Sequence, residues 1–352
     1  MREAVIVIAD LYLGPEPDRK AGAASRIRDV PVAAPTLEHL ARFGDRRTLT
    51  EGWRAWIARW AGLPQYAGEA PAAVAAAGAA VPVQANRTVW LATPLHLVAG
   101  LTSVHSDRRS LLHLTTAEAE TLAAAFAVTF RGSGLDLHPL ESGELLLSGP
   151  AEMASAITTE PARLLLTPIA ESLASGEGAA ALRRLGAEIE MWLYAHPLNE
   201  QRMRRGAPPV STLWVWGGGP SVSTGGVIAQ KVAASAFGTD AYLWGLWRLA
   251  GGESRPRPVD WAALVGEPRA ESALCVVEVA ELLHAHSSWH LADAVAEIDR
   301  RLLAPSLAAL HRGELDRLVL LANDHCSSLR AASRWQLWRR LRTVPRGVEC
   351  LA

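Results

Sequence analysis

An acidic residue follows the first apolar segment of the chain, and an acidic residue with a histidine follows the last apolar segment. Asp10 comes directly after residues 4–9, and Asp324 and His325 come directly after residues 317–323. If both segments are parallel strands, these side chains lie at the carboxyl edge of a sheet, where open α/β sheets bind ligands. Carboxylate and imidazole groups there form a half-shell for a divalent metal, which would neutralise charge on a phosphoryl group. Acids at strand ends also act as helix N-caps, and spacing alone leaves that alternative open.

Three histidines form a second candidate cluster in the segment LLHAHSSWH. They are His284, His286 and His290. On a continuous helix, His286 and His290 would share a face with the i, i+4 spacing of metal ligands. Because no carboxylate lies among the three, a plain polar surface is the alternative.

The elements that position these residues predict an α/β fold with a mostly parallel sheet flanked by helices. Buried strands are predicted at residues 4–9, 273–279 and 317–323. Strands that alternate with helices imply right-handed crossovers and a parallel sheet. The run from Leu213 to Trp216 is expected to be a further strand of this sheet, ended by three glycines. In the segment APTLEHLARFG, Thr36 is the expected cap of a short helix.

The middle of the chain mixes strand and helix patterns. Residues 115–118 carry the capping-box pattern of a helix start. A longer amphipathic helix follows, with four apolar residues on one face: Leu182, Leu185, Ile189 and Trp192. We therefore expect an inserted α+β domain at residues 76–194, with the core built from residues 1–75 and 195–352.

Composition excludes several classes of protein. The chain has 352 residues, is 49% hydrophobic and carries a net charge of −1, so it has no overall basic field for nucleic acid or anionic membranes. Its cysteines, Cys275, Cys326 and Cys350, fit neither a disulfide framework nor a CxxC zinc site. The sequence shows no signal peptide and no run of about 18 apolar residues that would span a bilayer. We expect a cytoplasmic protein.

Near its end, the sequence RAASRWQLWRRLR interleaves arginines with Trp335 and Trp338. Such a helix is a candidate interaction module for a nucleic acid, a membrane or a protein partner. The alternative is a surface helix with its tryptophans in the core and its arginines in water.

The segment HPLNEQRMRRGAPPVSTLWVWGGGP, from His196 to Pro220, resembles part of the archaeal-type, cofactor-independent phosphoglycerate mutases. In that family a polar stretch, a Gly-x-Pro-Pro turn and an apolar strand lead from an inserted domain back to a phosphatase-like core. The chain is also similar to RpfE-type bacterial regulatory proteins, which share TPLHL, here with His96, and the Trp-x-x-Trp-Arg-Arg sequence at residues 335–340. The resemblance covers most of the chain and implies an alkaline-phosphatase-like fold with an inserted α+β domain.

The resemblance also implies metal ligands. Asp10 corresponds to the ligand after the first strand, and Asp324 with His325 corresponds to the Asp-His pair of one metal site. In the Asp-x-x-x-His pattern of the second site, His284 fills the last position, but Ala280 stands where the aspartate belongs. The resemblance thus implies one divalent metal, manganese, zinc or cobalt, and a second site that is incomplete.

A nucleophilic Ser or Thr is expected at the N-terminus of the helix after the first strand, where amide groups bind the transferred phosphate. Thr50 is the nearest hydroxyl, with Thr48 second, and the Gly-Ser-Asp pattern of the mutases is absent. We therefore expect a phosphoglycerate-mutase-like protein with a degenerate site and a regulatory or ligand-binding role toward a small phosphorylated molecule. One alternative is an active metal-dependent phosphomutase or phosphatase. The other is an interaction module that uses the C-terminal Arg/Trp helix.

Overall fold

The computed structural model of the chain describes residues 2–11, 33–84, 87–100, 104–106, 108–153, 155–165, 169–221, 232, 234–265, 271–322 and 324–331. The chain divides into two compact units, each built from segments that are separate in sequence. The first unit comprises Met1–Ala67, Lys231–Gly238 and Glu253–Ala352, and the second comprises Gly68–Gln230 and Thr239–Gly252. Three ranges that we assigned to the core, residues 68–75, 195–230 and 239–252, therefore belong to the second unit.

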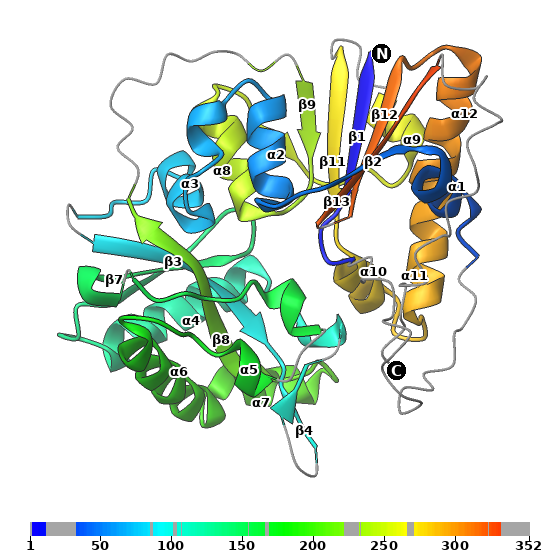
Figure 1. Cartoon of the computed structure of the whole chain (residues 1–352). Helices are drawn as coiled ribbons and strands as arrows, with labels where there is room; N and C mark the ends of the chain where they lie inside the picture. Colours follow the sequence, from blue (N-terminus) through cyan, green and yellow to red (C-terminus); the bar gives the residue numbers. More distant parts are fainter. Residues whose placement is uncertain are drawn as a thin grey trace, which may run out of the picture. The chain divides into compact units, whose positions relative to one another are not determined.

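A seven-stranded sheet, sheet A, forms the centre of the first unit, with strand order β10-β9-β11-β1-β12-β13-β2 (Figure 1). The first five strands in this order are parallel, and the last two pair antiparallel. The strands are β1 (Glu3–Ile8), β2 (Asp45–Thr48), β9 (Ala234–Phe237), β10 (Ser254–Arg255), β11 (Ser272–Val277), β12 (Arg317–Ala322) and β13 (His325–Arg330). The predicted α/β fold with a mostly parallel sheet is confirmed.

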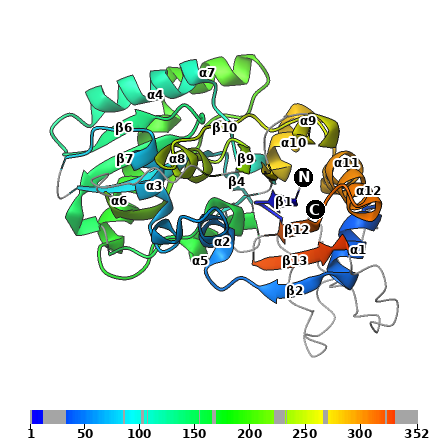
Figure 2. The same cartoon turned by 90° about the horizontal axis from the view of Figure 1, so that it is seen from above.

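Helices cover both faces of sheet A (Figures 1 and 2). On one side lie α1 (Pro35–Phe43), α11 (Leu291–Ile298) and α12 (Ala304–Arg312), and on the other lies α2 (Gly52–Trp60). Because successive side chains of a strand face opposite sides, a strand covered on both faces must be apolar throughout. In β1 all residues from Ala4 to Ile8 are buried, which explains the uninterrupted apolar run.

The cap of α1 comes from a residue far away in sequence. Thr36 lies inside this helix, and the N-cap position, Ala34, has no side chain that can accept a hydrogen bond. Instead, the carboxylate of Asp299 accepts hydrogen bonds from the N–H groups of Thr36 at 3.3 Å and Leu37 at 2.7 Å. Asp299 belongs to the π-helical segment Asp299–Leu303 between α11 and α12. The expectation that Thr36 caps the helix is therefore wrong.

The second unit is built on a four-stranded antiparallel sheet, sheet B, with order β6-β7-β3-β8. Its strands are β3 (Arg87–Leu95), β6 (Asp136–Pro139), β7 (Leu145–Pro150) and β8 (Thr212–Pro220). Side chains from sheet B share one core with α4 (Thr116–Thr129) and α6 (Ala179–Tyr194). The capping box between Thr115 and Glu118 is present, and α6 buries Leu182, Leu185 and Ile189, as predicted.

Strand β8 differs from the prediction in both its partner and its end. It pairs antiparallel with β3 in the second unit, whereas we expected a parallel strand of the core sheet. The glycines also continue the strand instead of ending it. A Cβ on Gly218 would lie 2.0 Å from the ring of Trp90, and Gly217 has a φ of +62° beside an irregularity in the β3–β8 register. The glycines thus let the backbone bulge and accommodate the indole.

Helix α3 (Pro71–Gly78) packs closely on α8 (Ala241–Leu249) within the second unit. The Ala-rich segment that contains α3 is part of the core, and its residues Ala72 to Ala76 are buried. The closest approach is between two glycines: a Cβ on Gly78 would lie 2.3 Å from the Cα of Gly245. Small side chains are required there because the two backbones meet.

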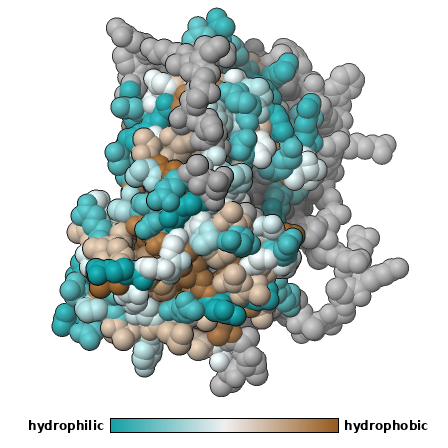
Figure 3. Space-filling model, turned by 90° about the vertical axis from the view of Figure 1, so that its left-hand side faces the viewer, coloured by the Kyte–Doolittle hydropathy of each residue, from teal (hydrophilic) through white to brown (hydrophobic). Residues whose placement is uncertain are grey.

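Apolar side chains also reach the surface of the second unit, and the face in Figure 3 mixes apolar with hydrophilic areas. Among the described residues of this unit, the large exposed hydrophobic side chains are Val104, Val128, Ile157, Leu173, Met191, Tyr194 and Met203. None of the helices in the described part of the chain is both long enough and apolar enough to cross a membrane. Trp335 and Trp338 lie outside the described residues.

Replacement of Gly78 or Gly245 by alanine should destabilise the second unit by about 1–3 kcal/mol, because the added methyl group overlaps the facing helix backbone. Gly186 in α6 is the matched control, since a Cβ there meets nothing within 4 Å. Gly186→Ala should stabilise the protein by about 0.5–1 kcal/mol through the helix preference of alanine. Urea unfolding monitored by circular dichroism measures all three variants. Equal effects at Gly78 and Gly186 would contradict the proposed close packing.

Candidate functional site

The carboxyl edge of sheet A brings two of the predicted site residues to the same end of neighbouring strands. In the parallel pairing of β1 with β12, Ile8 lies opposite Ala322. Asp10 and Asp324 each follow these paired residues by two positions, so both lie at this edge. Asp10 is buried, with 2% of its surface exposed.

The carboxylate of Asp10 holds the N-terminus of helix α10 (Val279–Ala285). Its Oδ1 accepts a hydrogen bond from the N–H of Val279 at 2.7 Å, and its Oδ2 accepts one from the N–H of Ala280 at 2.8 Å. A carboxylate on the first amides of a helix satisfies donors that have no partner inside the helix and interacts favourably with the helix dipole. Asp10 therefore acts as an N-cap for a helix that begins 269 residues later.

Asp324 and His325 lie beside the edge strand β2. The N–H of Leu49 donates to the backbone oxygen of Asp324 at 2.6 Å, and Thr48 lies opposite His325 in the β2–β13 register. Paired residues project to the same face of a sheet, as do residues two positions apart on a strand. Arg46, Thr48 and His325 therefore share one face.

The electrostatics of this face are set mainly by burial and by Arg46. Burial lowers the pKa of His325, the positive charge of Arg46 lowers it further, and Asp324 opposes the shift. Burial also lowers the pKa of the Arg46 guanidinium. Within the described part of the chain, the buried Nδ1 atom of His325 has no hydrogen-bond partner. Sequence reasoning did not select Arg46, because the polar segment DRRT gives no sign of its place beside His325.

Thr50 is exposed and precedes α2, whose N-cap position is Glu51. The backbone hydrogen bond between Leu49 and Asp324 places Leu49, the residue before Thr50, at this edge of the sheet. Thr50 thus remains the predicted nucleophile, although it lies outside the helix.

The three histidines lie at the end of α10, in the connection that follows it, and at the start of α11. His284 lies in the last turn of α10, His286 follows the end of that helix, and His290 precedes α11. His286 and His290 therefore do not lie on one continuous helix, which was the condition for a shared face. Across the described ranges, His, Cys, Asp and Glu side chains form no group of three or more that could hold a metal ion.

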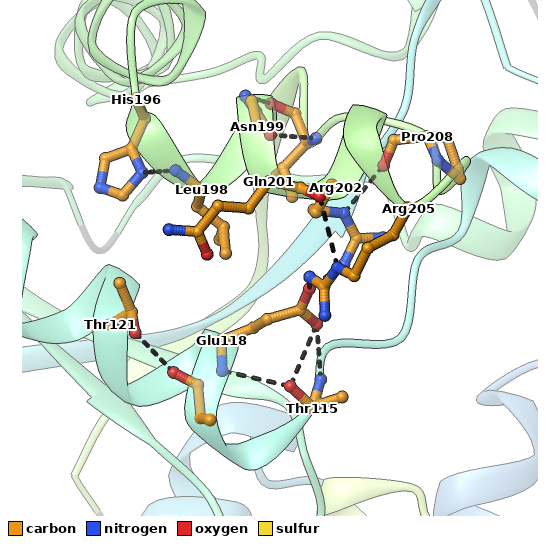
Figure 4. Close-up of polar contacts among 12 residues, drawn as sticks. Thr115, Glu118, Thr121, His196, Leu198, Asn199, Gln201, Arg202, Arg205 and Pro208 are labelled. Atoms are coloured by element: carbon orange, nitrogen blue, oxygen red, sulfur yellow. Dashed lines mark hydrogen bonds and ion pairs between the residues drawn. The ribbon is translucent and has the colours of Figure 1, made fainter.

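The polar segment that precedes β8 is occupied by contacts within the second unit (Figure 4). It forms α7 (Pro197–Arg204) and the turn that follows. Asn199 donates through Nδ2 to the backbone oxygens of Leu193 at 2.8 Å and Val210 at 2.9 Å, and its Oδ1 accepts from the N–H of Val210 at 2.7 Å. Asn199 thereby fastens the turn to the end of α6.

A buried ion pair joins α7 to α4 (Figure 4). Nη1 of Arg202 lies 2.9 Å from Oε1 of Glu118, and the two side chains are only 6% and 8% exposed. Arg205 bonds to the same oxygen at 2.9 Å but is 58% exposed. Desolvation opposes ionisation of Glu118, yet hydrogen bonds from Thr115 and the charge of Arg202 outweigh it and lower the pKa of this carboxyl. These polar residues therefore stabilise the fold of the second unit.

The two segments that carry the family resemblance also meet in this unit. Nδ1 of His96, from TPLHL, lies 3.0 Å from the backbone oxygen of Pro209 and 3.4 Å from the hydroxyl of Ser211. The same hydroxyl accepts a hydrogen bond from the N–H of Leu97 at 3.1 Å. These contacts tie the end of β3 to the turn before β8.

Comparison with known proteins supports a distant relationship to the cofactor-independent phosphoglycerate mutases. No family model matches the chain. The 2,3-bisphosphoglycerate-independent phosphoglycerate mutase of Methanothrix thermoacetophila is 26% identical over 191 residues, which cover 48% of this chain and 47% of that protein. The match thus spans about half the length of this relative. The chain is distantly homologous to this mutase.

Two solved structures are similar to most of the chain at low identity. A cofactor-independent phosphoglycerate mutase from Thermoplasma acidophilum is 15% identical, with a TM-score of 0.36, and the match covers 93% of this chain and 89% of that one. The PH0037 protein from Pyrococcus horikoshii is 14% identical, with a TM-score of 0.44, and the match covers 93% and 86%. Neither likeness assigns a ligand or an activity.

Replacement of Arg202 by alanine should cost about 3–5 kcal/mol, because the buried carboxylate of Glu118 loses its main counter-charge. Arg205→Ala removes a guanidinium from the same oxygen but should cost less than about 1 kcal/mol, since that side chain is mostly in water. Urea unfolding at neutral pH measures both. The contribution of Glu118 is present above its unfolded-state pKa and is lost as pH falls through the lower folded value. Similar losses in both variants would contradict this assignment.

Replacement of Asp10 by alanine should cost about 1–2 kcal/mol, because the first amides of α10 lose their cap. Asp10→Asn, which retains one acceptor oxygen, should lie between this variant and the wild type. Asp260→Ala is the matched control, because Asp260 accepts the N–H of Ala263 at 2.9 Å in an exposed setting. Thermal unfolding in the presence of a chelator measures the series. An unchanged melting temperature in Asp10→Ala would show that Asp10 does not act as a cap.

Proposed function

We propose that this protein is a phosphoglycerate-mutase-like binding protein with a degenerate catalytic site, which senses or sequesters a small phosphorylated metabolite. In the cell, the protein would then have a regulatory role like that of the RpfE-type proteins. The distant homology to a cofactor-independent mutase supports the class of ligand.

The hydrogen bonding of Asp10 is the observation that carries the proposal. Both carboxylate oxygens accept amide hydrogen bonds from α10, and one of the donors is the N–H of Ala280. Ala280 stands at the position where the resemblance expects a metal-binding aspartate. These two hydrogen bonds support a structural role for Asp10, as the cap of α10, in place of the predicted role as a metal ligand. Phosphoryl transfer without full neutralisation by metal would lose several kcal/mol of transition-state stabilisation.

Binding of a phosphate group without catalysis is supported by the charge at the strand edge. Arg46 projects to the same face as His325 and Thr48. A guanidinium in a partly desolvated setting binds phosphate oxygens through fork-like hydrogen bonds, and it needs no metal to do so. The resemblance assigns a divalent metal to Asp10, Asp324 and His325, but in the described part of the chain these side chains form no group of three that could hold one, so no step of the proposal uses a metal.

The purified full-length protein should show no interconversion of 2- and 3-phosphoglycerate with manganese, cobalt or zinc, and it should bind 3-phosphoglycerate in the presence of a chelator. Arg46→Gln should weaken that binding by about tenfold, the loss of one charge-assisted contact. Arg47→Gln is the matched control, because Arg47 is 78% exposed and projects to the opposite face of β2. Calorimetry and a coupled assay measure the two properties. Chelator-sensitive turnover would overturn the proposal.

A second candidate is an active metal-dependent phosphomutase or phosphatase. The position of Asp10 and Asp324 past paired strand ends favours it. In that case turnover would require metal and a hydroxyl nucleophile. Loss of turnover in Thr50→Ala but not in Thr48→Ala would identify the predicted nucleophile, and the reverse result would assign the role to Thr48 beside His325.

A further inference from the structure

A separate cleft lies in the first unit, between α10, α11 and the segment that follows β10. Its volume is about 190 Å³. Helices α10 and α11 contact each other and are neighbours in Figure 1. The floor is apolar and buried: Leu282, Ile298 and Leu302 are 8%, 3% and 1% exposed. This floor favours a ligand with an apolar body.

One wall of the cleft is aromatic. The rings of His286 and Trp289 are stacked, with centroids 3.8 Å apart and an interplanar angle of 18°. Each stacked ring keeps its outer face and its edge, and a planar apolar group packs on these in an offset or edge-to-face arrangement. The volume also sets a size, since a cavity of about 150 Å³ accommodates benzene. A six-membered ring that carries one short polar group therefore fits this cleft.

The polar side of the cleft has an excess of positive charge. Arg257 and Arg301 line it, and each is paired with a glutamate: Arg257 with Glu281 at 3.2 Å, and Arg301 with Glu297. Glu297 also binds Arg300 at 2.8 Å. Among the charged residues that line the cleft, Arg257 and Arg301 face one carboxylate, Glu297, which leaves one net positive charge on the lining. A guanidinium has five N–H donors, so a bond to one carboxylate leaves donor capacity for a second.

We propose that this cleft is a binding site for a small aromatic monocarboxylate, the ring lying against His286 and Trp289 and the carboxylate on Arg301 and Arg257. The single excess charge matches a monoanion. A fully polar phosphorylated sugar or glycerate would leave the apolar floor exposed to polar groups, which is unfavourable. This site is distinct from the strand edge that carries Asp10 and His325, and it does not depend on the function proposed above.

The test uses the full-length protein and phenylacetate as the probe, with calorimetry or ligand-observed NMR as the measurement. We expect saturable 1:1 binding of phenylacetate. Phenylacetamide, which lacks the charge, and acetate, which lacks the ring, should each bind at least about tenfold more weakly, equivalent to about 1.4 kcal/mol. Equal binding of phenylacetate and phenylacetamide would overturn the proposal, as would the absence of saturable phenylacetate binding at millimolar concentration.

Two variants locate the ligand. Ala285 lines the cleft and is exposed, so Ala285→Phe fills the volume without changing the core or the charges. Arg301→Gln removes the cation and leaves Arg300 on Glu297. Each should weaken phenylacetate binding at least tenfold, while Arg312→Gln, at an exposed arginine paired with Glu314, should bind as the wild type does. Circular dichroism confirms that each variant is folded. Wild-type affinity in Ala285→Phe would show that phenylacetate binds elsewhere.

Discussion

The pairing of β1 with β11 and β12 is the constraint on which the first unit depends. The N-terminal strand lies in the middle of sheet A, and its two neighbours begin at Ser272 and Arg317. Its side chains are buried on both faces, and its two edges are paired only when β11 and β12, far along the chain, have joined the sheet. Folding of this unit therefore requires closure over most of the chain, an entropic cost that grows only slowly with loop length. In sequence, both segments of the second unit lie between β1 and β11.

Buried carboxylates complete this arrangement where helices meet the sheet and one another. Asp10 caps α10, and Asp299 caps α1, each through two backbone amides. Burial raises the pKa of Asp299, which the amide bonds from Leu37 and Thr36 partly offset. A buried carboxylate is tolerated because it accepts bonds from amides that would otherwise lack partners. Both caps join segments more than 260 residues apart.

Local signals in the sequence were sufficient for part of the fold. The apolar runs of β1, β11 and β12, the Thr115–Glu118 capping box and the apolar face of α6 each depend on residues near in sequence, and each prediction was confirmed. Predictions failed where a distant partner decides the outcome. The cap of α1 is Asp299 and not Thr36, and β8 pairs with β3 in the second unit and not with a strand of the core sheet.

The glycines of β8 show the same limit. Three successive glycines indicate a turn, but Gly218 is required by the ring of Trp90, more than 120 residues earlier, and Gly219 by the close approach of Ala70. For the candidate site, parallel topology was enough to bring Asp10 and Asp324 to one sheet edge. It was not enough to find the hydrogen bonds to α10, because their donors are backbone amides and any residue type supplies them. Arg46 was missed because a short polar edge strand has no hydrophobic period.

The family resemblance divides into a part that concerns folding and a part that concerns chemistry. The segment from His196 to Pro220 directs its polar groups into the second unit: Asn199 fastens a turn, and Arg202 neutralises Glu118. The polar groups of this segment therefore serve the fold of the second unit, and its sequence resemblance carries no argument about phosphoryl transfer. The chemical argument depends on the few residues at the strand edge. There, each oxygen of Asp10 already accepts a hydrogen bond from a backbone amide of α10. A cation bound to Asp10 would therefore compete with the hydrogen bonds that hold the N-terminus of this helix.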